Sequence, residues 1–473
     1  MSEPHGESKA VKREAELRLE IESRQTQLSE LKEPPSDALF TDPASLVSFE
    51  RQVKSLTDQI QSLSCALRLQ QTLMSSAMHE RERKILAGDT RWTNYGYRPQ
   101  TIQTLGGLHV VVYARYWATH ANRARKGKGA SVAMLLLGFC EGCTPALASE
   151  VAQLAAALNS FDDAQARLLA MGVTMSIKKI SQIAYAFSER ARAQQQISGF
   201  GIPGTLKGRR VVISTDGGRL RIRSNKRGKK TAKGRSRYHT HWREPKLLVI
   251  YVVDEDGKMS SEFTPVLDGT LKGPDAVFAL IASYLKELEI TSADRVLFIA
   301  DGAKWIWCRV VKLWSKLGLR ADQIRELVDF YHVMEHVSSL AKMKRWKPSA
   351  RTAWVNRQRQ RLLKGEVAEF VSEIEQVTKG NSAGLRRERN YLLRNAKQGR
   401  LNYASVKAEQ LPIGSGTIES TVRRVVNLRL KGASLFWREP HAEAMLLLRA
   451  YYKARHWKVL ETKAFSPLTN LAA

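Results

Sequence analysis

Cysteine is scarce in this chain, with four residues among 473. Cys65 and Cys308 stand alone, and Cys140 and Cys143 form one CxxC pair. There is no second pair, and no suitably spaced histidines, to complete a zinc site. The cysteine pattern therefore argues against a disulfide framework and against a structural zinc site, and we expect all four thiols to be reduced.

Long apolar runs are also lacking. The longest one near the cysteines, residues 132–140, is too short to span a bilayer. The N-terminal segment is polar and charged, unlike a signal peptide. We therefore expect a cytoplasmic protein without a membrane partner.

Acidic residues are few beside basic ones, 46 against 76, which gives a net charge of +30. A polyanion is the natural partner of such a chain. Residues 219–237 are dense in Lys and Arg, interleaved with Gly, Ser and Asn, and hold no acid. A solvated β-hairpin or loop could have this composition, but its position beside Asp216 favours contacts with a phosphate backbone. The candidate contacts are Arg219, Arg221, Lys226, Arg227, Lys229 and Lys230.

Three of the acids present lie at the ends of predicted strands or on a predicted helix. Asp216 and Asp301 each end a short run of β-branched and apolar residues, and each is followed by glycine. A buried strand presents a carboxylate to a site at its end in this way. Glu419 instead follows a Gly-Ser-Gly segment and lies in a run with helical spacing, so we expect it to project from a helix. The apolar positions of that run are Ile418, Val422, Val425 and Leu428.

Carboxylates arranged in this way are typical ligands of divalent cations. Magnesium prefers oxygen ligands, and converging carboxylates with a substrate phosphate can hold two ions about 4 Å apart. We therefore predict two Mg²⁺ (or Mn²⁺) ions bound by Asp216, Asp301 and Glu419. An Asp-Gly pair taken alone is more often a strand-ending turn. Two strand-end acids followed by a helical glutamate are much less expected by chance.

The first 90 residues are predicted to form a helical, coiled-coil arm. Apolar residues recur at steps of three and four over three heptads, and Pro34 and Pro35 separate this seam from an earlier helix. The two helices could fold back as a hairpin or pair between chains, which would make the protein a homo-oligomer. The seam consists of Leu46, Phe49, Val53, Leu56, Ile60, Leu63 and Leu67.

Residues 91–200 are predicted to hold a small β segment and a DNA-binding helix pair. A β pattern at 101–117 turns at Gly106 and Gly107. Residues 162–170 and 176–190 have the proportions of a helix-turn-helix, in which Lys178 and Lys179 would face DNA. An ordinary helical bundle is the alternative. The residues expected to face inward are Ile177, Ile180, Ile183, Ala184 and Phe187.

From residue 205 onward the pattern predicts a multidomain α/β fold with a ribonuclease-H-like catalytic core. Strands are expected at 211–215, 220–223, 247–254 and 296–300, helices at 274–288 and 305–317, and a short strand ending near Asp329. In such a core, acids on the first and fourth strands meet an acid from a later helix. The core would comprise residues 205–332 and 411–460, interrupted by an all-helical insertion at 333–410.

Four motifs carry a resemblance to a known family. STDGG at Asp216, ADGAKWIW at Asp301, DFYHVMEH at Asp329 and GSGTIES at Glu419 resemble the DDE transposases of bacterial insertion sequences, in particular the IS-Kra family of the Mutator-like superfamily. The resemblance covers about residues 70–455. The segment from Asp329 to His332 fits the C/DxxH signature of the superfamily, and the long interval before Glu419 suits its helical insertion.

The resemblance implies that Asp216, Asp301 and Glu419 form the catalytic metal-binding triad of a DNA transposase. Such an enzyme binds the terminal inverted repeats of its element, cleaves the DNA and joins the exposed 3′ hydroxyl to double-stranded target DNA. It would be a nucleoid-associated bacterial protein. His332 is a further candidate catalytic residue, with a structural hydrogen bond as the alternative. Arg423, Arg424 and Lys431, which flank the glutamate, would face phosphates or form a solvated helix face.

Two other functions fit part of this pattern. A structure-specific ribonuclease-H-like nuclease would use the same acids but would not need the arm or the long insertion. A non-catalytic repressor derived from a transposase would keep the basic surface and tolerate loss of the acids. The presence of all three acids disfavours the repressor.

Overall fold

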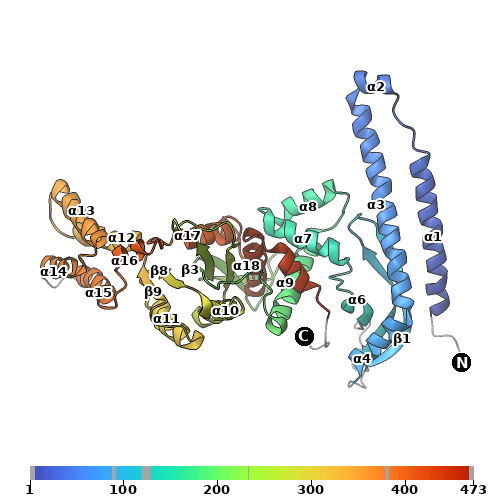
Figure 1. Cartoon of the computed structure of the whole chain (residues 1–473). Coiled ribbons are helices and arrows are strands. Elements are labelled where there is room, and N and C mark those ends of the chain that lie inside the picture. Colours follow the sequence, from blue (N-terminus) through green and yellow to red (C-terminus); the bar gives the residue numbers. More distant parts are fainter. Residues whose placement is uncertain (1–5, 88–91, 120–128, 233, 379–382, 468–473) are drawn as a thin grey trace. The chain divides into compact units, whose positions relative to one another are not determined.

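The computed structural model describes residues 6–87, 92–119, 129–232, 234–378 and 383–467 (Figure 1). The chain is mixed α/β and divides into two compact units, residues 1–197 with 460–473 and residues 198–459. No helix in the described ranges is both long enough and apolar enough to cross a membrane.

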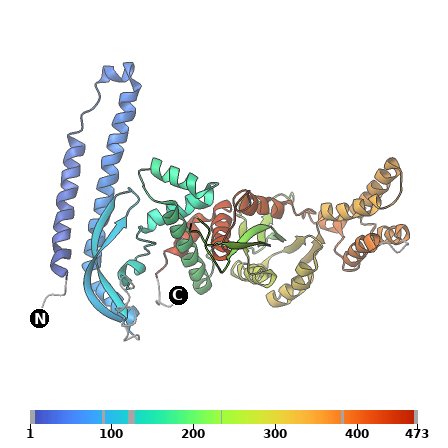
Figure 2. The same cartoon turned by 180° about the vertical axis from the view of Figure 1, so that it is seen from behind.

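The first unit begins with the helical arm that the heptad pattern predicts. Helix α1 (Glu7–Ser29) lies alongside α3 (Pro43–Met74), with the short α2 (Ser36–Thr41) between them in the chain (Figures 1 and 2). Of the two arrangements open from the sequence, the hairpin within one chain is present. Leu17 and Leu63 are buried in it, whereas Leu46 near the start of α3 stays 43% exposed.

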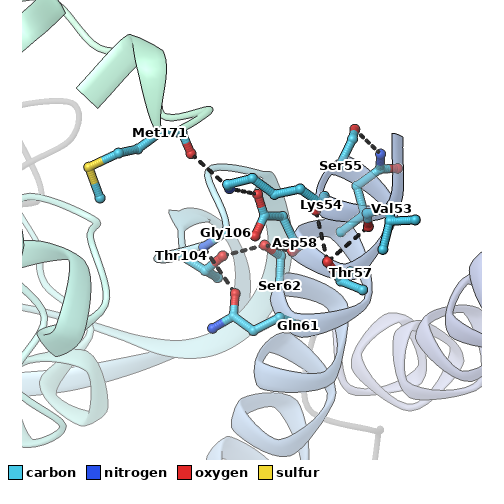
Figure 3. A network of polar contacts seen from close by, with 11 residues as sticks. Val53, Lys54, Ser55, Thr57, Asp58, Gln61, Ser62, Thr104, Gly106 and Met171 are labelled. Carbon is cyan, nitrogen blue, oxygen red and sulfur yellow. Dashed lines mark hydrogen bonds and ion pairs between the residues drawn. The ribbon is translucent and has the colours of Figure 1, made fainter. Parts of the chain in front are cut away.

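The predicted β segment is an antiparallel pair, β1 (Trp92–Gln103) and β2 (His109–Thr119), and β2 packs against α3. Figure 3 shows how α3 is fixed to the turn between the strands. The Thr104 hydroxyl donates to Ser62 Oγ at 2.6 Å, and the Gly106 N–H donates to Gln61 Oε1 at 3.0 Å. A Cβ on Gly106 would lie 2.3 Å from the Asp58 carbonyl oxygen, so the close approach needs glycine.

A short helix, α4 (Ser76–Leu86), follows the arm, and a helical region follows the β pair: α6 (Val132–Leu136), α7 (Pro145–Ala157), α8 (Phe161–Ala170) and α9 (Ile177–Ser198). The last two are the predicted helix pair. Ile180 and Phe187 are buried as expected, but the inward position predicted for Ile177 is wrong, since this first residue of α9 is 38% exposed. Cys140 and Cys143 lie in the apolar core of this region, and burial raises the pKa of both thiols to about 11.

The second unit is built on a five-stranded mixed sheet in the order β7-β6-β3-β8-β9. The central β3 runs antiparallel to β6 and parallel to β8; β7 is antiparallel to β6 and β9 is parallel to β8. A separate hairpin pairs β4 with β5. The bounds are β3 (Arg210–Gly217), β4 (Leu220–Asn225), β5 (Tyr238–Arg243), β6 (Lys246–Val253), β7 (Val266–Thr270), β8 (Arg295–Ala300) and β9 (Ile324–Val328).

Helices pack on this sheet. α17 contacts β3 and β6, α10 contacts β6 and β7, and α18 contacts β7. The segment after β9 is helical, as predicted for the insertion. The bounds are α10 (Pro274–Glu287), α11 (Lys304–Leu317), α12 (Phe330–Lys342), α13 (Pro348–Lys364), α14 (Val367–Val377), α15 (Ala383–Lys397), α16 (Tyr403–Ala408), α17 (Gly416–Val422), α18 (Glu439–Lys453) and α19 (Trp457–Ala464), with a 3₁₀ turn at Ile290–Ser292.

The helix that carries Glu419 is shorter and less regular than its sequence predicts. After Val422 it continues as a π-helical turn, Arg423–Asn427, and the Leu428 N–H donates to the Arg423 carbonyl five residues back. The extra residue shifts the helical phase. Leu428, which the helical spacing groups with the apolar positions of this run, is therefore 53% exposed, and Val426 is buried.

Candidate active site at the ends of two parallel strands

Asp216 and Asp301 lie side by side at one edge of the sheet. Strands β3 and β8 are parallel neighbours whose register pairs Ile213 with Phe298, and each acid is three residues further along its strand. Adjacent strands lie about 4.8 Å apart. The two carboxylates therefore project at the same level, and both residues are half-buried.

The environment of Asp216 disfavours its charge. Burial raises its pKa, and the negative charge of Asp301 raises it further. The Gly217 N–H, which donates to Asp216 Oδ1 at 2.6 Å, and the Lys246 ammonium both oppose these effects. A divalent cation bound between the two carboxylates would offset both their mutual repulsion and the cost of burying the Asp216 charge.

Lys246 is a member of this site that the sequence pattern did not single out. It pairs with Gly217 across β3 and β6, and its Nζ lies 2.7 Å from Glu244 Oε1. The ammonium also lies 3.9 Å from the centroid of the Trp305 ring, and the residue is 5% exposed. A lysine at the first position of an apolar strand usually has a solvated side chain, so the sequence alone does not indicate that Lys246 belongs to a site.

The loop of Asp301 is held by the helical insertion. The Gly302 N–H donates to the hydroxyl of Tyr391 at 3.1 Å, and Arg394 donates to the Gly302 carbonyl at 2.9 Å. From its own element, Trp307 Nε1 donates to the Asp301 carbonyl at 2.7 Å. The insertion thus fixes the position of one of the two acids through α15.

Tyr391 is itself supported by a hydrogen-bonded pair of side chains, His336 and Glu388. Its ring stacks on His336 with 3.6 Å between centroids, and His336 Nδ1 contacts the Glu388 carboxylate, which is nearly fully buried. The raised pKa of Tyr391, caused mainly by burial and next by Asp301, keeps the phenol protonated. Tyr391 of the helical insertion therefore helps to hold the loop that carries Asp301.

The signature acid Asp329 acts as a clamp between two helices. Its Oδ1 accepts the His332 N–H at 2.7 Å and so caps α12, while its Oδ2 accepts the Ser415 hydroxyl at 2.8 Å and also the Ser415 N–H. Ser415 is the N-cap residue of α17. Asp329 is 2% exposed, so it joins the start of α12 to the helix that carries Glu419. The His332 imidazole is part-exposed and lies 3.5 Å from Glu335.

Glu419 lies on α17, which packs over β3 and β6. Thr417, near the start of this helix, interacts with the Tyr251 side chain of β6. The Glu419 side chain is exposed. In the described ranges no three His, Cys, Asp or Glu residues are gathered so as to hold a metal. The structure thus brings Asp216 and Asp301 together, and leaves Glu419 on a neighbouring helix outside that pair.

The predicted DNA contacts are spread over several elements. Lys226, Arg227, Lys229 and Lys230 are exposed in the loop between β4 and β5, and Arg219, Arg423, Lys431 and Lys178 are also exposed. Arg221 and Arg424 are part-buried. Lys179 is part-buried as well and donates to the Glu141 carbonyl, so its predicted outward position is only partly correct.

A cavity of about 560 Å³ opens at the opposite edge of the sheet, at the residues that begin β3 and β8, Arg210 and Arg295. Because parallel strands begin at one edge and end at the other, this cavity is remote from the two acids. It takes no part in the candidate site.

A comparison of the sequence with protein-family models finds no matching family, and a comparison with curated proteins finds no significant match.

Proposed function

We propose that the chain is a DDE-type DNA transposase with a ribonuclease-H-like core, which cleaves the ends of its element and joins the 3′ hydroxyl to target DNA. The observation that carries the proposal is that Asp216 and Asp301 lie at the same level on adjacent parallel strands, with the helix of Glu419 packed on β3 and β6. A net charge of +30 supports DNA as the substrate.

The strand order supports the ribonuclease-H-like assignment. If the five strands are numbered by their order along the chain, they lie side by side in the sheet in the order third, second, first, fourth and fifth. The second strand is antiparallel to the first and to the third, whereas the fourth and fifth run parallel to the first. The acids follow the first and fourth of these strands. This strand order and these two acid positions support the proposed core, in which Glu419 from a later helix would be the third acid.

The donor set at Asp216 and Asp301 fits a divalent cation, because the burial and mutual repulsion of the pair are relieved by positive charge. Glu419 is the third candidate ligand. A pair of Mg²⁺ or Mn²⁺ ions supplies an activated oxygen nucleophile and stabilises the leaving oxygen in phosphoryl transfer.

The chain's own residues would orient the reaction. Tyr391 and Arg394 hold the loop of Asp301, and Asp329 fixes the start of the glutamate helix. The Lys246 ammonium lies at the same edge, where its positive charge opposes the rise in the pKa of Asp216. Exposed cations of the β4–β5 loop would contact the DNA backbone and position it without reading its sequence.

The test uses DNA taken from the flanks of the gene, with any inverted repeats found there as donor ends. Asp216→Asn, Asp301→Asn and Glu419→Gln should each abolish cleavage and strand transfer in the presence of Mg²⁺. Affinity for DNA should be retained, because contacts with backbone phosphates dominate it. Asp256→Asn, in an exposed turn at the far end of β6, is the matched control and should keep full activity.

Other outcomes would point to other functions. Cleavage of junctions or flaps without strand transfer would identify a structure-specific nuclease. Binding without cleavage by the parent protein would identify a repressor. Full activity in any one of the three acid variants would remove that residue from the site.

A further inference from the structure

The β4–β5 hairpin carries exposed aromatic rings next to arginine side chains. Arg221 and Trp242 are cross-strand partners, as are Asn225 and Tyr238. Trp242 is 51% exposed and Tyr238 is 43% exposed. Large aromatic side chains are normally covered in a folded domain. Their exposure on a basic hairpin therefore indicates a surface that could bind a ligand with a flat apolar face.

Arg221 is fixed in place beside these rings. Its guanidinium donates to the Gly432 carbonyl at 2.6 Å and lies 4.7 Å from the centroid of the Phe436 ring. The same guanidinium lies 5.7 Å from the Trp242 ring, and that of Arg219 lies 5.2 Å from it. The indole is therefore held by two cations while half of its surface stays open to solvent.

A cavity of about 460 Å³ lies between the hairpin and the segment that follows the glutamate helix. Trp242 and Arg221 form one side, and Asn427, Leu430 and Lys431 contribute to the other. The lining combines an aromatic ring, three apolar side chains, an amide that can donate and accept, and two cations. Its volume falls within the range of sites that bind small planar ligands, roughly 300–1,000 Å³.

Both walls of the cavity continue from elements of the candidate active site. Strand β4 begins four residues after Asp216, and Asn427 ends the π-helical turn that follows the helix of Glu419. Gly218 lies between Asp216 and β4 and packs against Val426, where an added Cβ would be 3.3 Å from a Val426 methyl group. The chain therefore leads directly from Asp216 and from the helix of Glu419 to the walls of this cavity.

We propose that the cavity binds one unstacked nucleobase of the DNA substrate. Trp242 stacks on the face of the base, Asn427 hydrogen-bonds to its edge, and Arg221 and Lys431 contact the flanking phosphates. The proposal rests on the proposed function, because it takes DNA as the substrate. A base removed from the duplex offers the flat face, the polar edge and the adjoining negative charge that this lining matches.

The test measures binding of the full chain to three fluorescent DNA probes without metal, so that cleavage does not interfere. The probes are a fully paired duplex, the same duplex with one unpaired thymine, and the same duplex with an abasic site in place of that thymine. We expect the parent to bind the unpaired thymine about tenfold more tightly than the paired duplex, which is within the range of base–aromatic stacking. The abasic probe should lose this preference.

Two variants separate stacking from charge. Trp242→Ala should remove the preference for the unpaired thymine and leave affinity for the paired duplex within about twofold, whereas Trp242→Phe should keep most of the preference. Lys230→Ala, in the exposed loop of the same hairpin, should weaken binding to all three probes alike and keep the preference.

Each result decides a different question. A parent that binds no DNA contradicts the proposed function. A parent that binds duplex DNA without preferring the unpaired thymine overturns only the base-binding inference. A preference that survives in a folded Trp242→Ala protein places the base elsewhere and also overturns it.

Discussion

The charge of Asp216 is disfavoured by its burial and by Asp301, so removing that charge should stabilise the protein. Asp216→Asn keeps an oxygen that can accept the Gly217 N–H. Without metal we expect the melting temperature to rise by on the order of 2 °C. With Mg²⁺ the parent should gain further stability, as any site that binds only the folded state does, and the variant should not.

Thermal melts with and without Mg²⁺ measure both effects, with Asp256→Asn as the variant that should change neither. A Mg²⁺-dependent gain that persists in Asp216→Asn would mean that this carboxylate does not bind the ion.

In the proposed enzyme Tyr391 would act by positioning the loop of Asp301, and its hydroxyl can be removed without removing the ring. Tyr391→Phe loses the acceptor of the Gly302 N–H but keeps the stack on His336. We expect cleavage to fall by about tenfold, because small misplacements at a reacting centre are costly, and DNA affinity to be unchanged. Tyr403→Phe is the matched control, since it loses a buried hydrogen bond to the Val328 carbonyl and does not contact the acid loop.

Cleavage rates and melting temperatures of the two tyrosine variants separate positioning from stability. Equal losses of activity in both would show that Tyr391 acts only through the stability of the fold.

At the scale of elements, Asp329 joins α12 to α17 through one buried carboxylate. Asp329→Asn can keep one accepting oxygen, but its amide nitrogen cannot accept from Ser415. We expect the free energy of unfolding to fall by about 1–3 kcal/mol and cleavage to be lost with it, because the start of the glutamate helix is released. Ser160→Ala, which removes the N-cap of α8, should cost about 1 kcal/mol and leave cleavage intact. Denaturant unfolding and a cleavage assay provide the comparison.

The loop between β4 and β5 tests the electrostatic part of DNA binding. Replacing Lys226, Arg227, Lys229 and Lys230 by alanine should weaken binding to all DNA sequences about equally. The slope of log K against log salt should flatten by about 0.9 for each phosphate that the loop no longer neutralises. A weakening confined to the element's own ends, measured by titration at several salt concentrations, would instead assign base reading to the loop.

The elements that the sequence predicts well have strong local patterns. The runs before Asp216 and Asp301 are β-branched and apolar because their strands are buried in the sheet. Strand β5 was missed because its residues are polar and mostly exposed, and β7 because it is short and contains Gly269. The π-helical turn after Glu419 was missed because no residue pattern marks an inserted position.

The site could be predicted only where the acids follow their own strands. Lys246 reaches Asp216 through pairing of β3 with β6, and Tyr391 reaches the Asp301 loop across 89 positions of sequence. Such contacts depend on tertiary structure and leave no local signal. The sequence indicates that Asp329 belongs to a motif, but it does not predict that its carboxylate joins the starts of α12 and α17, because Ser415 is 86 positions away in the chain.

At the scale of the whole molecule, the arm bears on assembly, because a transposase must hold two element ends in one complex. We propose that the protein is a homo-oligomer. The heptad seam of α3 is nevertheless occupied within the chain, since α1 packs along it and β2 also packs against α3. Ser62 and Gln61 further tie α3 to the turn between β1 and β2 (Figure 3). We therefore expect the oligomer to form through another surface.

The double change Leu56→Asp and Ile60→Asp tests this expectation, because both side chains are part-buried on α3. Placing two charges in the seam costs several kcal/mol, so α1 should separate from α3 and become sensitive to limited proteolysis. The mass measured by light scattering should stay that of the parent. Leu19→Asp, at a position of α1 that is 65% exposed, is the control and should change neither. A fall in mass while α1 remains protected would show instead that the seam joins two chains.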